Sequence, residues 1–171
     1  MTTIKELTSA EYAPYFQQYL SLNNPDLGIM DVLITSREQT LSFLDQLDRP
    51  LDYRYAKDKW TIAEVLMHNI DTERIFQYRA LRFLRGDASE LAGFDQDRFV
   101  ASLKGHAFAK AELQQSFSTT RASTIDIFKY ASEEQLKNSG VASGKVMSAR
   151  VIPFLIAGHN KHHENIITER Y

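Results

Sequence analysis

Apolar residues recur every three to four positions in five stretches of the chain, which is the spacing of helices that bury one face. In the second stretch, for example, Ile34, Leu41 and Leu44 lie on the same side. The chain has only seven glycines and four prolines, too few for a loop-rich β architecture. We therefore predict an all-α fold with four helices in a bundle and a fifth, which periodicity does not identify, as a flank. The predicted helices span 8–22, 30–47, 61–86, 107–130 and 148–171, with a further short turn of helix over 132–138.

Local signals mark several helix ends. Thr61 and Glu64 have the spacing of a capping box, in which each side chain bonds the backbone N–H of the other residue. Pro14 fits best in the first turn of its helix, so that helix can begin a few residues after position 8. Pro153 lies about one turn into the last helix, where we expect a bend and one lost hydrogen bond. The polar segment 138–145, with its two glycines, is predicted to be a loop.

The composition is that of one globular domain spanning residues 1–171. Apolar residues make up 43% and charged residues 25%, and no repeat or linker divides the chain. The net charge of −2 creates no field that would recruit nucleic acid or an anionic membrane. The longest apolar run, 151–158, is far shorter than the roughly 20 residues of a membrane span. Because the polar start also lacks the features of a secretion signal, we expect a cytoplasmic protein without nucleic-acid or membrane partners.

The histidines carry the clearest chemical signal. The chain has no cysteine, so any bound metal must be held by imidazole and carboxylate groups. His159 and His163 are four residues apart on a predicted helix, about 6 Å along its axis, and this spacing allows both rings to face one ion. His162 points about 100° away from that direction. From spacing alone, the alternative remains that the histidines, His68 included, are buried rings satisfied by ordinary hydrogen bonds.

Other candidates have a functional and a simpler interpretation. Asp71 is one turn beyond His68 and could accept a hydrogen bond from a ligand or act as a base, but an ion pair with Arg74 is favoured. Trp60 and the aromatic residues of the first helix could line a cleft, although packing is favoured. His106 is expected to be unrelated to the site. A basic run could receive an anionic substrate, although a solvated face is favoured for it, and it consists of Arg74, Arg79, Arg82 and Arg85.

Three segments together resemble the DinB-like superfamily, which includes the YfiT-type metalloenzymes. They are the tryptophan-to-histidine segment 60–68, Gly93-Phe-Asp-Gln-Asp-Arg98 and the H-x-x-x-H ending at 159–163. The resemblance covers nearly the whole chain and implies a four-helix bundle with one long crossover. It also implies one divalent metal ion per chain (nickel, zinc or iron) and a homodimer. The family's metal ligands correspond to His68, His159 and His163.

Three protein ligands leave at least one coordination position open, which is the pattern of a catalytic site rather than a structural one. The resemblance therefore suggests a metal-dependent enzyme acting on a small-molecule substrate. Both thiol S-transferase and hydrolase chemistry fit, and a low-molecular-weight thiol is a candidate partner. The alternative is a non-catalytic, stress-associated metal-binding or scaffold protein. The acidic charge balance argues against DNA binding. The sequence identifies no catalytic residue beyond the metal ligands.

Overall fold

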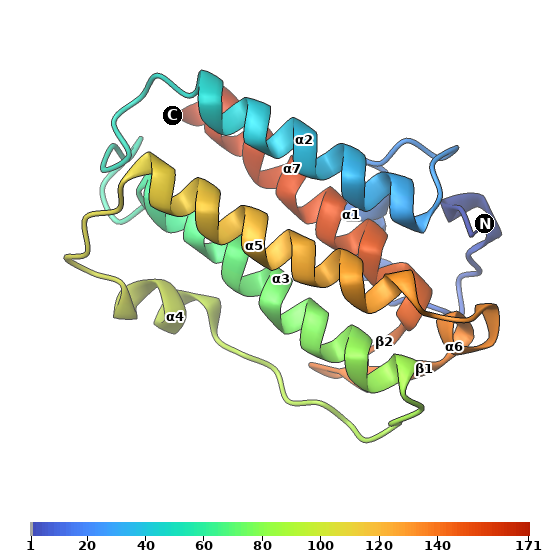
Figure 1. Cartoon of the computed structure of the whole chain (residues 1–171). Helices are drawn as coiled ribbons and strands as arrows, with labels where there is room; N and C mark the ends of the chain where they lie inside the picture. The colour runs from blue at the N-terminus through green and yellow to red at the C-terminus, as the bar shows by residue number, and fades with distance from the viewer. Residues whose placement is uncertain (1) are drawn as a thin grey trace.

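The computed structural model describes residues 2–171 and is dominated by four long helices (Figure 1). Each packs on two others: α2 and α3 both contact α5 and α7. The all-α prediction is confirmed, and four of the five predicted helices agree with the structure to within a few residues. Their bounds are α2 (Ile29–Gln46), α3 (Ile62–Leu84), α5 (Lys110–Lys129) and α7 (Ile152–Arg170).

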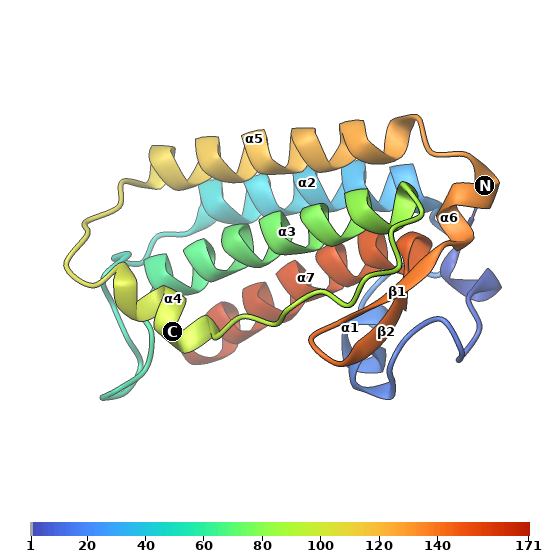
Figure 2. The same ribbon diagram turned by 90° about the horizontal axis from the view of Figure 1, so that it is seen from below.

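A long crossover joins α3 to α5, as the family resemblance implied. The two helices are neighbours that run in the same direction, so residues 85–109 must return along the side of the bundle (Figure 2). The crossover contains a short helix that the sequence analysis did not predict, α4 (Gln96–Ser102). Asp95 caps this helix, because its carboxylate accepts hydrogen bonds from the backbone N–H groups of Asp97 and Arg98.

The predicted first helix over 8–22 is largely wrong. The structure has only a 3-10 turn, η2 (Pro14–Phe16), followed by the single turn α1 (Gln17–Leu20), and another 3-10 turn, η1 (Ile4–Glu6), precedes them. Pro14 does occupy a first turn, as expected. Ahead of it, the backbone of Glu11 and Ala13 pairs with residues 146–148 rather than within a helix. This N-terminal segment is the flank of the bundle.

The predicted loop over 138–145 is also corrected. It belongs to an antiparallel hairpin of β1 (Ser139–Ala142) and β2 (Lys145–Ser148), which follows the short helix α6 (Glu133–Lys137). The two turn residues, Ser143 and Gly144, have φ values of 54° and 67°. Positive φ at both positions is what the common two-residue hairpin turn requires. The crossover pairs with one edge of the hairpin at Leu91, and the N-terminal segment pairs with the other edge at Tyr12.

The last helix begins later than predicted. A 3-10 turn, η3 (Ala149–Val151), precedes α7, so Pro153 is the second residue of the helix and not one turn in. Since the first N–H groups of a helix have no internal partner, the expected loss of a hydrogen bond does not occur. Ser148 is the cap residue of η3, but its hydroxyl donates to the Glu11 carboxylate instead of capping.

Buried apolar side chains form two clusters. One includes Leu33, Phe83 and Phe154, and the other includes Leu44 and Phe117. On α7 the first cluster uses Ile152 and residues 154–157 and the second uses Ile167, so the histidines of α7 lie between the two. No helix within residues 2–171 is both long and apolar enough to cross a membrane.

Candidate metal centre

The structure brings His68, His159 and His163 together between α3 and α7. One potential ligand atom from each ring lies within 4.8 Å of the other two. The Nε2 atoms of His68 and His159 are 3.3 Å apart, although 91 residues separate them in sequence. The three ring centroids are 4.6 to 5.0 Å from one another. The packing of α3 against α7 thus completes the histidine pair that the helical spacing predicted.

These distances fit a shared metal ion. Two nitrogens that each lie about 2.0–2.1 Å from a tetrahedral ion are about 3.4 Å apart, close to the separation of the two Nε2 atoms. Nδ1 of His163 is buried and has no hydrogen-bond partner within residues 2–171. An unpaired buried nitrogen calls for a ligand or water to satisfy it. The donor set is therefore suited to a divalent metal ion.

Burial keeps the three rings neutral. It lowers the pKa of His68 from the ordinary 6.5 to about 4 and that of His163 to about 3. Burial also lowers the pKa of His159 well below its ordinary value, and the neighbouring histidines lower it further. Only neutral imidazole has a lone pair to offer a metal. At neutral pH all three rings are thus in the form that binds a metal.

Aromatic rings hold two of the histidines in place. The Trp60 ring lies 5.0 Å from that of His68, and the Tyr19 ring lies 5.4 Å from that of His159 in an edge-on arrangement. Gly158 allows α1 to come this close. A Cβ atom at position 158 would lie only 2.0 Å from the Tyr19 carbonyl oxygen. These contacts restrict the rings before any ligand binds.

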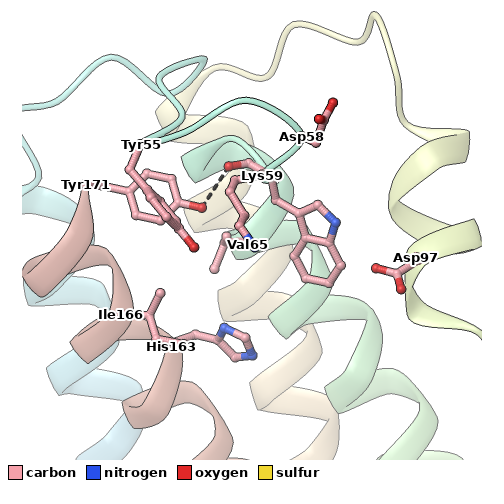
Figure 3. A pocket seen from close by; sticks show the side chains of 9 residues that line it. Tyr55, Asp58, Lys59, Val65, Asp97, His163, Ile166 and Tyr171 are labelled. Carbon is pink, nitrogen blue, oxygen red and sulfur yellow. Dashed lines mark hydrogen bonds between the residues drawn. The ribbon is translucent and has the colours of Figure 1, made fainter.

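A cavity of about 260 Å³ opens at His163, and we call it the Tyr171 cavity (Figure 3). Tyr55 and Tyr171 form one wall, where the Tyr171 hydroxyl donates to the Trp60 carbonyl oxygen at 2.7 Å. Asp97 reaches the cavity from α4, so the crossover contributes to the site.

A second cavity, of about 220 Å³, contacts the cluster at His68 and His159, and we call it the Arg79 cavity. The bundle, the N-terminal segment, the crossover and the hairpin all contribute to its wall. Its further lining residues are Tyr15, Phe16, Tyr19, Thr72, Phe76, Arg79, Phe94, Gln96, Ala142, Ser143 and Lys145.

Several predictions for single residues are confirmed. His162 lies outside the cluster, half-buried, with its ring 5.5 Å from that of Tyr19. Asp71 pairs with Arg74 at 3.0 Å, which was the favoured interpretation. His106 is exposed, is not part of the cluster, and its ring lies 4.3 Å from the tilted ring of Phe108.

Other site residues differ from expectation or were missed. Trp60 and most aromatic residues of the first predicted helix line the two cavities, whereas the sequence analysis favoured a packing role for them. Arg79 is 5% exposed and does not belong to a solvated face. Ser143 and Lys145 were missed because the hairpin was not predicted. The Ser143-Gly144 dipeptide is a turn signal that would have indicated it.

The model of the DinB superfamily matches residues 33–167. The chain belongs to the DinB superfamily. Its fold resembles that of YfiT from Bacillus subtilis, described as a probable metal-dependent hydrolase with an unusual four-helix bundle topology. That match has a TM-score of 0.66 at 14% identity and covers 99% of this chain and 90% of the other. No curated protein matches the sequence significantly.

Proposed function

We propose that this DinB protein binds one divalent metal ion through His68, His159 and His163 and is a metal-dependent enzyme. The observation that carries the proposal is the cluster itself: three neutral imidazoles, those of His68 and His159 buried and that of His163 partly buried, with converging nitrogens and no carboxylate bonded to them within residues 2–171. The two cavities, one lined by His163 and the other by His68 and His159, give a small molecule access to the cluster.

The open coordination position determines the class of reaction. A bound divalent ion supplies Lewis acidity, which activates water or a thiol for attack on an electrophile. Hydrolysis and thiol transfer are therefore the two reactions proposed, with a low-molecular-weight thiol as a candidate co-substrate. The description of YfiT supports hydrolysis. The residues of this chain orient the ligand rings through Trp60 and Tyr19 and surround the substrate with two part-aromatic cavities.

The donor set also limits the metal. Imidazole suits zinc, nickel and iron, whereas magnesium and calcium prefer oxygen ligands. We propose one of the first three, bound in a cytoplasmic protein. The absence of cysteine is compatible with that location.

Cobalt substitution tests whether the site has an open position. We expect the visible spectrum of the cobalt protein to change when azide or a low-molecular-weight thiol is added, because either can enter an open position. The His68→Ala variant should fold but lose the response, whereas the His106→Ala control should keep it. A cobalt spectrum indifferent to every such ligand would contradict the enzyme proposal. The ion would then serve to hold α3 to α7, as in the scaffold alternative.

A further inference from the structure

Arg79 is buried and has no anionic partner within residues 2–171. Its guanidinium donates a hydrogen bond to the Ser143 hydroxyl at 2.7 Å and lies 5.6 Å from the centre of the Phe76 ring. Other arginines removed from water are paired: Arg121 with Glu73 at 2.7 Å, and Arg150 with Glu11 at 2.6 Å. Burying a charge is costly unless an opposite charge compensates it.

The guanidinium borders the same cavity as two of the candidate metal ligands, His68 and His159. His68, Thr72, Phe76 and Arg79 follow each other at intervals of four, four and three residues, so they form one stripe along α3, and all four line the Arg79 cavity. About 16 Å of helix rise separates the first from the last. A long arginine side chain on a helix leans back toward the N-terminal turns. In α3 that direction leads toward His68.

The hairpin tip adds a second positive charge and a fixed orientation. Lys145 lines the cavity, with its ammonium group 5.1 Å from the centre of the Tyr15 ring. Ser143, in the turn, holds the guanidinium through its hydroxyl. Beside these charges stand the aromatic rings of Tyr19, Phe76 and Phe94. The cavity therefore combines a positive end, an apolar wall and two histidine rings.

We propose that the Arg79 cavity binds the carboxylate of a small organic anion whose apolar body reaches toward the histidine cluster. The planar guanidinium matches a carboxylate through two parallel hydrogen bonds. The volume of about 220 Å³ restricts the ligand to a small molecule. Identifying this anion with the substrate rests on the proposed function, whereas the anion site itself does not.

A matched pair of ligands isolates the charge. We choose 4-phenylbutyrate and its neutral amide, 4-phenylbutyramide, and measure both by calorimetry on the zinc-loaded protein. The acid should bind roughly tenfold or more tightly than the amide, as a charge-assisted pair with Arg79 implies. Arg79→Gln should abolish this preference. The Arg85→Gln control should retain it, because Arg85 is exposed at the end of α3 and does not line the Arg79 cavity.

Two further variants keep the test decisive. Arg79→Lys retains the charge but lacks the planar fork, so it should lower the preference even if Arg79→Gln does not fold. His163→Ala removes a proposed metal ligand that does not line the Arg79 cavity, and the preference for the acid should persist in it. Equal binding of acid and amide, or no binding of the acid, would overturn the proposal. A preference that survives Arg79→Gln but disappears in His163→Ala would also overturn it, because the metal would then hold the anion. The cobalt test depends on the histidines and this one on Arg79, so either can fail alone.

Discussion

The three histidines are arranged as ligands rather than as ordinary core residues. Nε2 of His68 faces Nε2 of His159 at 3.3 Å, and at most one of these two atoms can donate a hydrogen bond to the other. The other hydrogen-bonding contact of His68 is long, at 3.5 Å between its Nδ1 atom and the Thr72 hydroxyl. Buried polar atoms normally have better partners than these. An ion between the rings would satisfy the nitrogens together.

Metal content should depend on His163 but not on His162. Replacing His163 with Ala removes a nitrogen of the cluster and should release most of the metal. Replacing His162, whose half-buried ring lies against Tyr19, should leave the metal in place. Elemental analysis of the two purified variants measures this directly. Equal metal content in both would show that the ligands are wrongly assigned.

Acid should destabilise the metal-free protein over a defined pH range. Burial lowers the folded-state pKa of His68 to about 4, below its unfolded value of 6.5. The unfolded chain therefore binds more protons between these values, so the free energy of unfolding rises with pH there. For His68 the contribution is about 3 kcal/mol, present above pH 6.5 and lost as the pH falls toward 4.

Urea titrations with a chelator at several pH values test this prediction. The His68→Gln variant should lose part of the pH dependence, since it lacks one of the titrating rings. A free energy of unfolding that is flat from pH 7 to pH 4.5 would contradict the assigned burial effect.

Arg79 shows what helical periodicity can and cannot reveal. Its distance of 11 residues from His68 is close to three turns, so the shared face was available from the sequence. The partners that bury Arg79 were not, because Ser143 and Lys145 come from a hairpin about 65 positions later in the chain. Likewise, spacing paired His159 with His163, whereas only the family resemblance added His68.

Among the secondary-structure elements, the long helices were the predictable ones. The capping box of Thr61 and Glu64 forms as expected. Because each long helix buries one face, its apolar residues keep the helical spacing over many turns, and the sequence shows that spacing clearly. The N-terminal segment 8–22 was misleading because its aromatics have helical spacing, yet they cover the site while its backbone bonds the hairpin. The strands, at four residues each, are too short to show a clear alternation.

The buried ion pair of Arg121 and Glu73 should contribute much more to the free energy of unfolding than the exposed pair of Arg74 and Asp71 on α3. Arg121 is fully buried in α5, and it joins Glu73 of α3 to the Leu33 carbonyl oxygen of α2. Arg121→Ala leaves the Glu73 charge buried and unpaired, which should cost about 3–5 kcal/mol of unfolding free energy. Urea denaturation provides the measurement.

The matched control removes an exposed pair from α3. Arg74→Ala breaks the solvent-accessible ion pair between Arg74 and Asp71. It should lower the free energy of unfolding by less than about 1 kcal/mol. Comparable losses in the two variants would mean that the Arg121 network does not tie the three helices together.

The whole molecule is expected to be a homodimer, on the basis of the resemblance to DinB proteins. Phe16 and Tyr19 of the N-terminal segment line the Arg79 cavity, so they add no support to this expectation. Light scattering at micromolar concentrations should give twice the chain mass of 19.6 kDa. A constant monomer mass over that range would rule the dimer out.

The crossover explains how the chain assembles a site from distant parts. Because α3 and α5 are parallel, the connection between them must travel the length of the bundle (Figure 2). On the way it lays Phe94 and Gln96 over one cavity and Asp97 beside the other. The hairpin then uses the crossover as an edge partner at Leu91. This outer layer follows from topology, which local sequence patterns do not specify.

Removing the metal should lower the stability of the whole bundle. The proposed ligands lie on α3 and α7, so a bound ion links helices from opposite halves of the chain. An ion that binds only the folded state stabilises it by about 2.7 kcal/mol when its free concentration is 100 times the Kd. A chelator should therefore lower the Tm, and added zinc should restore it. In His68→Ala the Tm should respond to neither, because the link between the two helices is lost, whereas His106→Ala should behave as the wild type does. A wild-type Tm unchanged by the chelator, with metal loss verified by elemental analysis, would show that the ion does not hold α3 to α7.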